Sequence, residues 1–261
     1  MNNLDIKHHY TEHGAGEYLI LLHGNGENSS YFDHQINHFS AYYHVIALDT
    51  RGHGRTPRGN TPFTIRQFAW DLLHFMDNQG ISKANILGFS DGANIAMLFA
   101  IAHPERVIRL VLNGGNLDAR GIKPSTQLWI EAGHRLARLF APWSVKAKAH
   151  AEMLGLMVND PNIETASLRD IKAETLVIAG SHDMVKETHT KHIASNIPNA
   201  RLSIIEGDHF VANRRPEAFN SVVLNFLQTQ TAESAGTGTA TARPALPTKP
   251  FETIDTHHKR Q

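Results

Sequence analysis

The sequence predicts an α/β protein with a mostly parallel central sheet, helices on both faces of that sheet, and a small helical lid inserted before the acid-bearing strand. Short apolar runs alternate along the chain with helical patterns, which is typical of strands joined by crossover helices. The apolar runs are continuous, as expected of strands buried on both faces. One long interval late in the chain lacks such runs.

Six apolar runs are the predicted strands. Each is short, most are rich in Val, Ile and Leu, and each ends in small or polar residues. This pattern predicts parallel strands whose crossovers are right-handed. The runs are residues 18–24, 44–52, 84–90, 107–115, 174–180 and 200–207.

The segments between these runs have the spacing of helices. Residues 64–80 place five apolar side chains on one helical face, and Gly80 suits the C-terminal cap. Residues 92–103 are rich in Ala, Met and Leu and precede a proline. Residues 214–228 have Pro216 near the first turn of a closing helix. The apolar face of the first helix consists of Ile65, Phe68, Leu72, Phe75 and Met76.

Residues 116–168 interrupt the alternation because they contain no strand-like run. They hold two helical patterns, 124–140 and 143–157, and one crossover does not need about fifty residues. We interpret this segment as a helical lid; the alternative is a pair of ordinary crossover helices packed on the sheet. The predicted organisation is therefore a discontinuous core, residues 1–115 and 169–230, with the lid at 116–168.

The end of the chain differs in composition. Residues 231–261 are rich in Thr, Ala, Gly and Pro and have almost no large apolar side chain. Such a segment buries too little surface to offset the entropy lost on ordering it. We predict a disordered tail.

The overall composition excludes several classes of function. Lys plus Arg and Asp plus Glu number 25 each, so the zero formal charge gives no electrostatic case for binding nucleic acid or an anionic membrane. The chain has no cysteine, which excludes disulfides and thiolate catalysis. No apolar run approaches the roughly 18 residues of a membrane span. The first residues lack a signal-peptide pattern, and we expect a cytoplasmic protein.

The pentapeptide GFSDG, residues 88–92, predicts a nucleophile. It fits the pattern G-x-S-x-G between a strand and a helix, where a very tight turn forces the serine into an unfavourable backbone angle. Gly88 and Gly92 leave room for the two arms of the turn to pass each other. Ser90 would then project over the strand ends, where ligands bind in open α/β sheets.

A serine nucleophile needs a base, and the base needs an orienting carboxylate. In this kind of fold the chain order is serine, acid, histidine. Asp183 follows the next-to-last predicted strand, and His209 follows the last one. Three less suitable residues are Asp208, which is too close in sequence to His209, Asp118, which follows an earlier strand, and His182, which precedes the acid.

An oxyanion hole requires two backbone N–H groups. One belongs to the residue after the nucleophile, Asp91, whose side chain we expect to point away along the helix. The second belongs to the glycine-rich loop HGNG, residues 23–26, and we assign it to Asn25. His23 is expected to brace this loop rather than to take part in chemistry.

Together these residues resemble the α/β-hydrolase superfamily, over roughly residues 5–229 and in particular its compact, lid-bearing serine esterase and peptidase-like members. The resemblance implies that Asp49, Arg51 and Gly52 are scaffold, since that stretch is usually structural in the superfamily. The marks of the resemblance are HGNG at 23–26, DTRGHGRT at 49–56, GFSDG at 88–92, Asp183 in GSHDMV and His209 in GDHF.

The sequence departs from the superfamily pattern in two ways. The N-terminal part is short, so the first antiparallel strands are expected to be abbreviated or missing. The lid is small, which indicates a fairly open pocket and small substrates. Related dehalogenases and epoxide hydrolases have an aspartate at the elbow, whereas this chain has Ser90.

The predicted activity is that of a carboxylesterase-like serine hydrolase, acting on a small carboxylic ester or related acyl substrate through an acyl-enzyme. The same residues suit amide, C–C or thioester cleavage, and they also suit an acyltransferase. A non-catalytic or single-turnover ligand-binding or signalling protein of this fold is the other alternative. Five lid side chains are expected either to bind substrate or to pack between lid and sheet: Trp129, Phe140, Trp143, Met153 and Met157.

No cofactor and no metal site are expected. The histidine pair His189 and His192, and the His-His pairs at 8–9 and 257–258, have no carboxylate cluster that would complete a metal site. We interpret them as solvated surface or tail residues. The expected partner is a small acyl substrate, and the oligomeric state is left open.

Overall fold

The computed structural model describes residues 5–229 of the 261-residue chain. The predicted tail at 231–261 lies outside these residues. Residues 1–228 form one compact unit, which holds every helix and strand described below. Among the described residues, none of the helices is long and apolar enough to cross a membrane.

A seven-stranded sheet forms the centre of this unit, in the order β1-β3-β2-β4-β5-β6-β7. All six predicted strands are confirmed, and they pair in parallel. β1 pairs antiparallel with β3, so the N-terminal antiparallel part is abbreviated to one four-residue strand. The strands are β1 (Tyr10–His13), β2 (Tyr18–Leu22), β3 (His44–Leu48), β4 (Ala84–Phe89), β5 (Val107–Asn113), β6 (Glu174–Gly180) and β7 (Ala200–Ile205).

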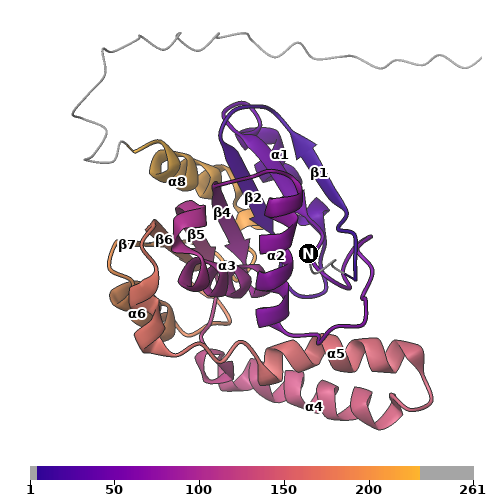
Figure 1. Cartoon of the computed structure of the whole chain (residues 1–261). Coiled ribbons are helices and arrows are strands. Elements are labelled where there is room, and N and C mark those ends of the chain that lie inside the picture. Colours follow the sequence, from indigo (N-terminus) through magenta and orange to yellow (C-terminus); the bar gives the residue numbers. More distant parts are fainter. Residues whose placement is uncertain (1–4, 230–261) are drawn as a thin grey trace, which may run out of the picture. The chain divides into compact units, whose positions relative to one another are not determined.

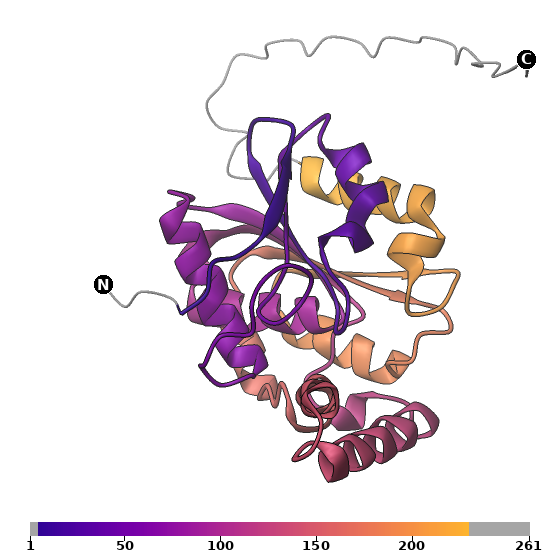
Figure 2. The same cartoon turned by 90° about the vertical axis from the view of Figure 1, so that its right-hand side faces the viewer.

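Helices cover both faces of the sheet (Figures 1 and 2). The helices are α1 (Asp33–Phe39), α2 (Ile65–Asn78), α3 (Asp91–Ala102), α4 (Pro124–Phe140), α5 (Val145–Asn159), α6 (Glu187–Asn196), α7 (Val211–Arg214) and α8 (Pro216–Gln228). The 3-10 turns are η1 (Ser29–Phe32), η2 (Pro104–Arg106), η3 (Ala119–Gly121) and η4 (Thr165–Asp170).

The alternation of side chains along each strand divides the core into two layers. On β2, Ile20 and Leu22 pack with α2 and α3, whereas Leu19 and Leu21 pack with α1 and α8. Both sets are fully buried, which explains why the parallel strands are continuous apolar runs in the sequence.

The loop after β3 is the scaffold that the resemblance implied. The carboxylate of Asp49 accepts hydrogen bonds from the backbone N–H groups of Ser29, at 2.7 Å, and Arg55, at 2.8 Å. The fully buried Arg51 bonds to Asp71 on α2, with an N–O distance of 2.7 Å. These contacts tie β3 to α2 and to the loop after β2.

The helices α4 and α5 connect β5 to η4 and β6 and lie side by side at one end of the sheet (Figures 1 and 2). Their bounds agree with the predicted helical patterns. The hydroxyl of Ser144 caps α5 by accepting a hydrogen bond from the N–H of Ala147. Leu156 on α5 is buried, whereas no residue of α4 is buried.

Candidate active site

Ser90 lies at a strained turn between β4 and α3. Its φ of 54° and ψ of −118° are in a region that residues with a side chain rarely adopt. Both glycines of the pentapeptide are required by space. A Cβ on Gly88 would lie 2.2 Å from the carbonyl oxygen of Gly92, and a Cβ on Gly92 would lie 2.0 Å from that of Leu22. The serine stands between two glycines because the strand and the helix pass too closely for any side chain.

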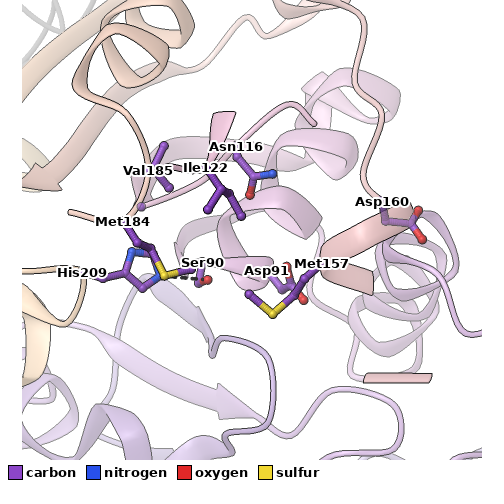
Figure 3. Close-up of a pocket in the computed structure, with 10 residues that line it drawn as sticks. Ser90, Asp91, Asn116, Ile122, Met157, Asp160, Met184, Val185 and His209 are labelled. Atoms are coloured by element: carbon purple, nitrogen blue, oxygen red, sulfur yellow. Dashed lines mark hydrogen bonds between the residues drawn. The ribbon is translucent and has the colours of Figure 1, made fainter. Parts of the chain in front are cut away.

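The structure brings Ser90, His209 and Asp183 into one hydrogen-bonded chain. Nε2 of His209 lies 3.0 Å from Oγ of Ser90, and Nδ1 lies 2.7 Å from Oδ1 of Asp183 (Figure 3 shows the first of these bonds). If Nδ1–H donates to the carboxylate, Nε2 is left to accept the serine proton. His209 and Asp183 are both buried, so this pairing is shielded from water.

Adjacent parallel strands place the acid and the histidine. Asp183 follows β6 and His209 follows β7, and these strands are paired along their length. The N–H of Val185 also donates to Oδ1 of Asp183, at 2.9 Å. The other oxygen, Oδ2, has no hydrogen-bond partner among residues 5–229, so nothing else there competes with His209 for this carboxylate.

Gly114 is a residue of this site that sequence reasoning missed. It follows β5 with a φ of 64°, and a Cβ there would lie 2.7 Å from Cε1 of His209. The signal that could have found it is the pair of glycines at 114–115, directly after an apolar run. The imidazole occupies the space that the missing side chain leaves.

The three less suitable residues lie elsewhere. Asp208 accepts a hydrogen bond from the N–H of Phe210 and pairs with an arginine, and Asp118 pairs with Arg120. His182 is exposed and bonds to the hydroxyl of its neighbour. None of these side chains makes a hydrogen bond to His209 or Ser90 in the described part of the chain.

His23 braces the loop after β2, as predicted. Its Nδ1 lies 2.7 Å from the carbonyl oxygen of Gly24, and its Nε2 accepts a hydrogen bond from the N–H of Thr50. Burial lowers the pKa of His23 to about 4, and the nearby His53 lowers it further. This imidazole is therefore neutral at pH 7, with its proton on Nδ1.

The loop after β2 meets the start of α3 through Asn25. Its side-chain amide donates to Oδ2 of Asp91, at 2.9 Å, and to the carbonyl oxygen of Met153 on α5, at 2.8 Å. The backbone N–H groups of Asn25 and Asp91 have no acceptor within residues 5–229. Both predicted oxyanion donors therefore lie on neighbouring segments and have free N–H groups.

The carboxyl group of Asp91 lines the pocket beside Ser90 (Figure 3), and the prediction that it points away is wrong. Asp91 is buried because Asn25 and the end of α5 cover the start of α3. Burial raises the pKa of Asp91 to about 6, against the lowering effect of the Asn25 hydrogen bond, and the charge of Asp160 raises it further. Burial also raises the pKa of Asp160, which lines the same pocket.

Glu27 adds a third carboxyl group near the site. Its Oε2 accepts a hydrogen bond from the N–H of Gly24, at 3.2 Å. Burial raises the pKa of Glu27 to about 7, while that bond and the charge of His209 act in the opposite direction. Sequence reasoning missed this residue because a glutamate in a glycine-rich loop carries no distinctive pattern.

The pocket has a volume of about 260 Å³ and is narrower than the fairly open pocket expected from the small lid. Side chains from α5 and from the loops after β5 and β6 surround Ser90. The lining residues are Ser90, Asp91, Gly114, Asn116, Ile122, Met157, Asp160, Met184, Val185 and His209.

Only part of the predicted lid set reaches this pocket. Met157 lines it, and Met153 contributes its backbone carbonyl to the bond with Asn25. Trp129, Phe140 and Trp143 neither line it nor pack between lid and sheet, because their exposed fractions are 78%, 51% and 79%. Their assignment to substrate binding is wrong in this structure, since these side chains face solvent.

The histidine pairs have other partners. Nε2 of His189 accepts a hydrogen bond from the N–H of Leu117, and Nε2 of His192 bonds to the hydroxyl of Thr165. Among residues 5–229, no three His, Cys, Asp or Glu side chains form a group that could hold a metal ion.

Comparisons with known proteins agree with this fold and site. Residues 17–141 match the model of a family described as the alpha/beta hydrolase fold. A putative carbamate hydrolase RutD from Caulobacter sp. strain K31 is 28% identical, over 82% of this chain and 91% of its own. An (E)-2-((N-methylformamido)methylene)succinate hydrolase from Acinetobacter baylyi is 27% identical, over 85% of this chain and 94% of its own.

A crystal structure of the enol-lactonase from Burkholderia xenovorans LB400 superposes with a TM-score of 0.74, at 23% identity, and covers 86% of this chain and 97% of that one. At this identity the likeness concerns the fold. The chain belongs to the α/β-hydrolase superfamily.

Proposed function

We propose that this protein is a serine hydrolase that cleaves a small carboxylic ester, or a related acyl compound, through an acyl-enzyme at Ser90. The observation that carries the proposal is the hydrogen-bonded chain from Ser90 through His209 to Asp183, at 3.0 and 2.7 Å. A nucleophile, a base and an orienting acid in this order are what acyl transfer to a serine requires.

In the first half-reaction, Oγ of Ser90 attacks the carbonyl carbon while its proton passes to Nε2 of His209. The N–H groups of Asn25 and Asp91 donate to the oxyanion that forms, and Asp183 stabilises the imidazolium. The bond from the carbonyl carbon to the leaving oxygen then breaks. The leaving alcohol takes the proton from Nε2, and the acyl group stays on Ser90.

In the second half-reaction, His209 takes a proton from water, and the resulting hydroxide attacks the acyl-enzyme. The new tetrahedral intermediate uses the same two N–H donors. Its collapse breaks the bond to Oγ of Ser90, which recovers its proton from Nε2. The products are a carboxylic acid and an alcohol, and the enzyme returns to its starting protonation state.

The relatives support hydrolysis of a small molecule. They carry the names of a carbamate hydrolase, an enol-lactonase and a hydrolase of a formamido-methylene succinate. These names cover several acyl bonds, so they favour the reaction class rather than one substrate. The volume of about 260 Å³ favours small acyl groups, since drug-sized ligands occupy roughly 300–1,000 Å³.

The charge of the pocket favours a substrate that carries a positive group near its carbonyl. Asp91 and Asp160 both line the pocket, and no Lys or Arg side chain does. Above pH 6 the Asp91 carboxylate is ionised and only partly covered by its bond from Asn25. A protonated amine would neutralise it, whereas a carboxylate there would be repelled.

The first experiment is release of p-nitrophenol from short and medium p-nitrophenyl esters by the native chain and by Ser90→Ala. Turnover that disappears in the variant supports the proposal, and equal turnover in both contradicts it. One equivalent of product without further turnover would instead favour the single-turnover ligand-binding protein. Ester formation with an added alcohol in place of hydrolysis would favour the acyltransferase.

A second experiment tests the charge preference. Two esters of equal chain length are compared, one with a protonated amine on the acyl chain and the other with a methyl group in its place. We expect the cationic ester to have a kcat/KM at least about tenfold higher at pH 8, and Asp91→Asn to reduce that ratio toward one. An unchanged ratio in the variant would contradict a role for this carboxylate in binding.

A further inference from the structure

Helix α4 carries an apolar stripe that faces solvent. The five large members of the stripe have exposed fractions of 51% to 78%. At 100° per residue, the members fall within about one third of the helix circumference. The stripe consists of Leu128, Trp129, Ala132, Leu136, Leu139 and Phe140.

The opposite face of α4 packs on α5 through small and polar residues. A Cβ on Gly133 would lie 3.3 Å from Cδ1 of Leu154, and a Cβ on Gly155 would lie 3.6 Å from Nε2 of His134. An amphipathic helix normally turns its apolar side to the core, and α4 does the reverse. An apolar surface of this size marks an interaction site.

The hairpin of α4 and α5 is also locally basic. Residues 123–152 contain five Lys or Arg residues and two acids. Both acids are paired: Glu152 with Arg58 at 2.9 Å, and Glu131 with Arg135 at 3.7 Å. Arg138, Lys146 and Lys148 are exposed and form no ion pair among residues 5–229, although the whole chain has no net formal charge.

We propose that this hairpin binds an anionic lipid surface, with α4 lying in the plane of the surface. The stripe would enter the apolar boundary, and the cations beside it would meet the lipid phosphates. Two exposed tryptophans, Trp129 on the stripe and Trp143 just after it, suit a lipid–water boundary because the indole is apolar with one polar N–H.

Charge distinguishes this occupant from a second copy of the chain. A twofold contact between two α4 stripes would bring two net positive hairpins together, and the repulsion would oppose the contact. An anionic surface is attracted by the same charges. The proposal does not rest on the function of Ser90, so vesicle binding and ester hydrolysis test the two ideas separately.

The test is co-sedimentation of the full chain with vesicles of phosphatidylcholine plus phosphatidylglycerol, and with vesicles of phosphatidylcholine alone. We expect binding to the anionic vesicles that weakens with added salt. Leu136→Glu with Leu139→Glu should lower the affinity at least about tenfold, because both changes put charge on the inserted face. Both side chains are exposed, so the fold and its circular dichroism should not change.

The matched control is Trp70→Glu, which changes an exposed aromatic residue on α2, outside the hairpin, and should leave binding unchanged. In a Trp70→Phe background, the emission of Trp129 and Trp143 should shift to shorter wavelength with anionic vesicles. Three results would overturn the proposal: no binding to anionic vesicles, equal binding by the double Leu→Glu variant, or a dimer in solution that this variant dissociates while vesicles bind neither form.

Discussion

The strain at Ser90 is held in place by its neighbours. A residue in such a conformation costs about 1–3 kcal/mol, which the surrounding contacts must offset. The N–H of Ser90 donates to the carbonyl oxygen of Asn113 at 2.8 Å, and its carbonyl oxygen accepts from the N–H groups of Ala93 and Asn94. These bonds fix Oγ toward His209 before any substrate arrives.

Gly114 should control the position of His209. In Gly114→Ala, the new methyl group would overlap the imidazole, and its carbon would also be held at a φ of 64°. We expect kcat/KM to fall by about 100-fold or more, because the ring must move away from Ser90. Ester hydrolysis, with the fraction of folded chain checked by circular dichroism, measures this effect.

The matched control is Gly80→Ala, at the end of α2. Gly80 also has a positive φ, 68°, but a Cβ there would meet nothing within 4 Å. This variant should lose about 1 kcal/mol of stability and keep its activity. If both variants lost activity alike, backbone strain rather than displacement of His209 would be the cause.

Asp91 should make the stability of the protein depend on pH. Its pKa is about 6 in the folded chain against 3.8 without the fold, so the folded state binds the proton more tightly. Its contribution to stability is therefore present below pH 4 and is lost as the pH rises through 6. A difference of about two pKa units corresponds to about 3 kcal/mol.

The variant Asp91→Asn removes this titration and keeps an oxygen that can accept the Asn25 hydrogen bond. We expect the variant to be more stable than the native chain by about 1–3 kcal/mol at pH 8 and nearly equal to it at pH 4. Urea unfolding at both pH values measures this difference. A variant that is less stable at pH 8 would mean that the carboxylate stabilises the fold in its charged form.

At the scale of elements, the sequence predicted those whose own residues define them. The continuous apolar runs marked β2 to β7, and the apolar face of 64–80 marked α2. Helices α1 and α6 were missed because each is short, and α6 buries only Thr190 and Ile193. The outward stripe of α4 could not be predicted, because periodicity gives the apolar face of a helix but not its direction.

The link between β3 and α2 gives a prediction at this scale. Arg51 is fully buried, and its guanidinium makes two bonds to Asp71, at 2.7 and 2.9 Å. Arg51→Met should lower the free energy of unfolding by about 3–5 kcal/mol, because it leaves the Asp71 carboxylate buried without its partner. Equilibrium unfolding in urea measures the loss.

The double variant Arg51→Met with Asp71→Leu is the control. It removes both charges, so it should recover most of the stability lost in the single variant. A double variant as unstable as the single one would show that the packing of Arg51, rather than its charge, holds the loop. Since neither residue lines the pocket, the specific activity of the folded fraction should stay near that of the native chain.

At the scale of the whole molecule, chain order placed Ser90, Asp183 and His209, because the carboxyl ends of neighbouring parallel strands meet at one edge. The walls of the pocket were less predictable. Ile122, Met184 and Asp160 come from loops and a helix end, whose positions depend on tertiary packing. Sequence reasoning therefore found the groups predicted to do the chemistry but not the surfaces predicted to select a substrate.

The division of the chain predicts the effect of removing its end. Residues 1–228 form one unit, and α8 closes its core with Phe226 and Leu227, both nearly fully buried. A chain that ends at Thr229 keeps every one of these contacts. We expect its melting temperature to lie within about 2 °C of the native value and its kcat/KM within twofold, as measured by calorimetry and ester hydrolysis. A larger loss of melting temperature would mean that residues 230–261 pack on this unit, and a loss of activity alone would mean that they contribute to the site.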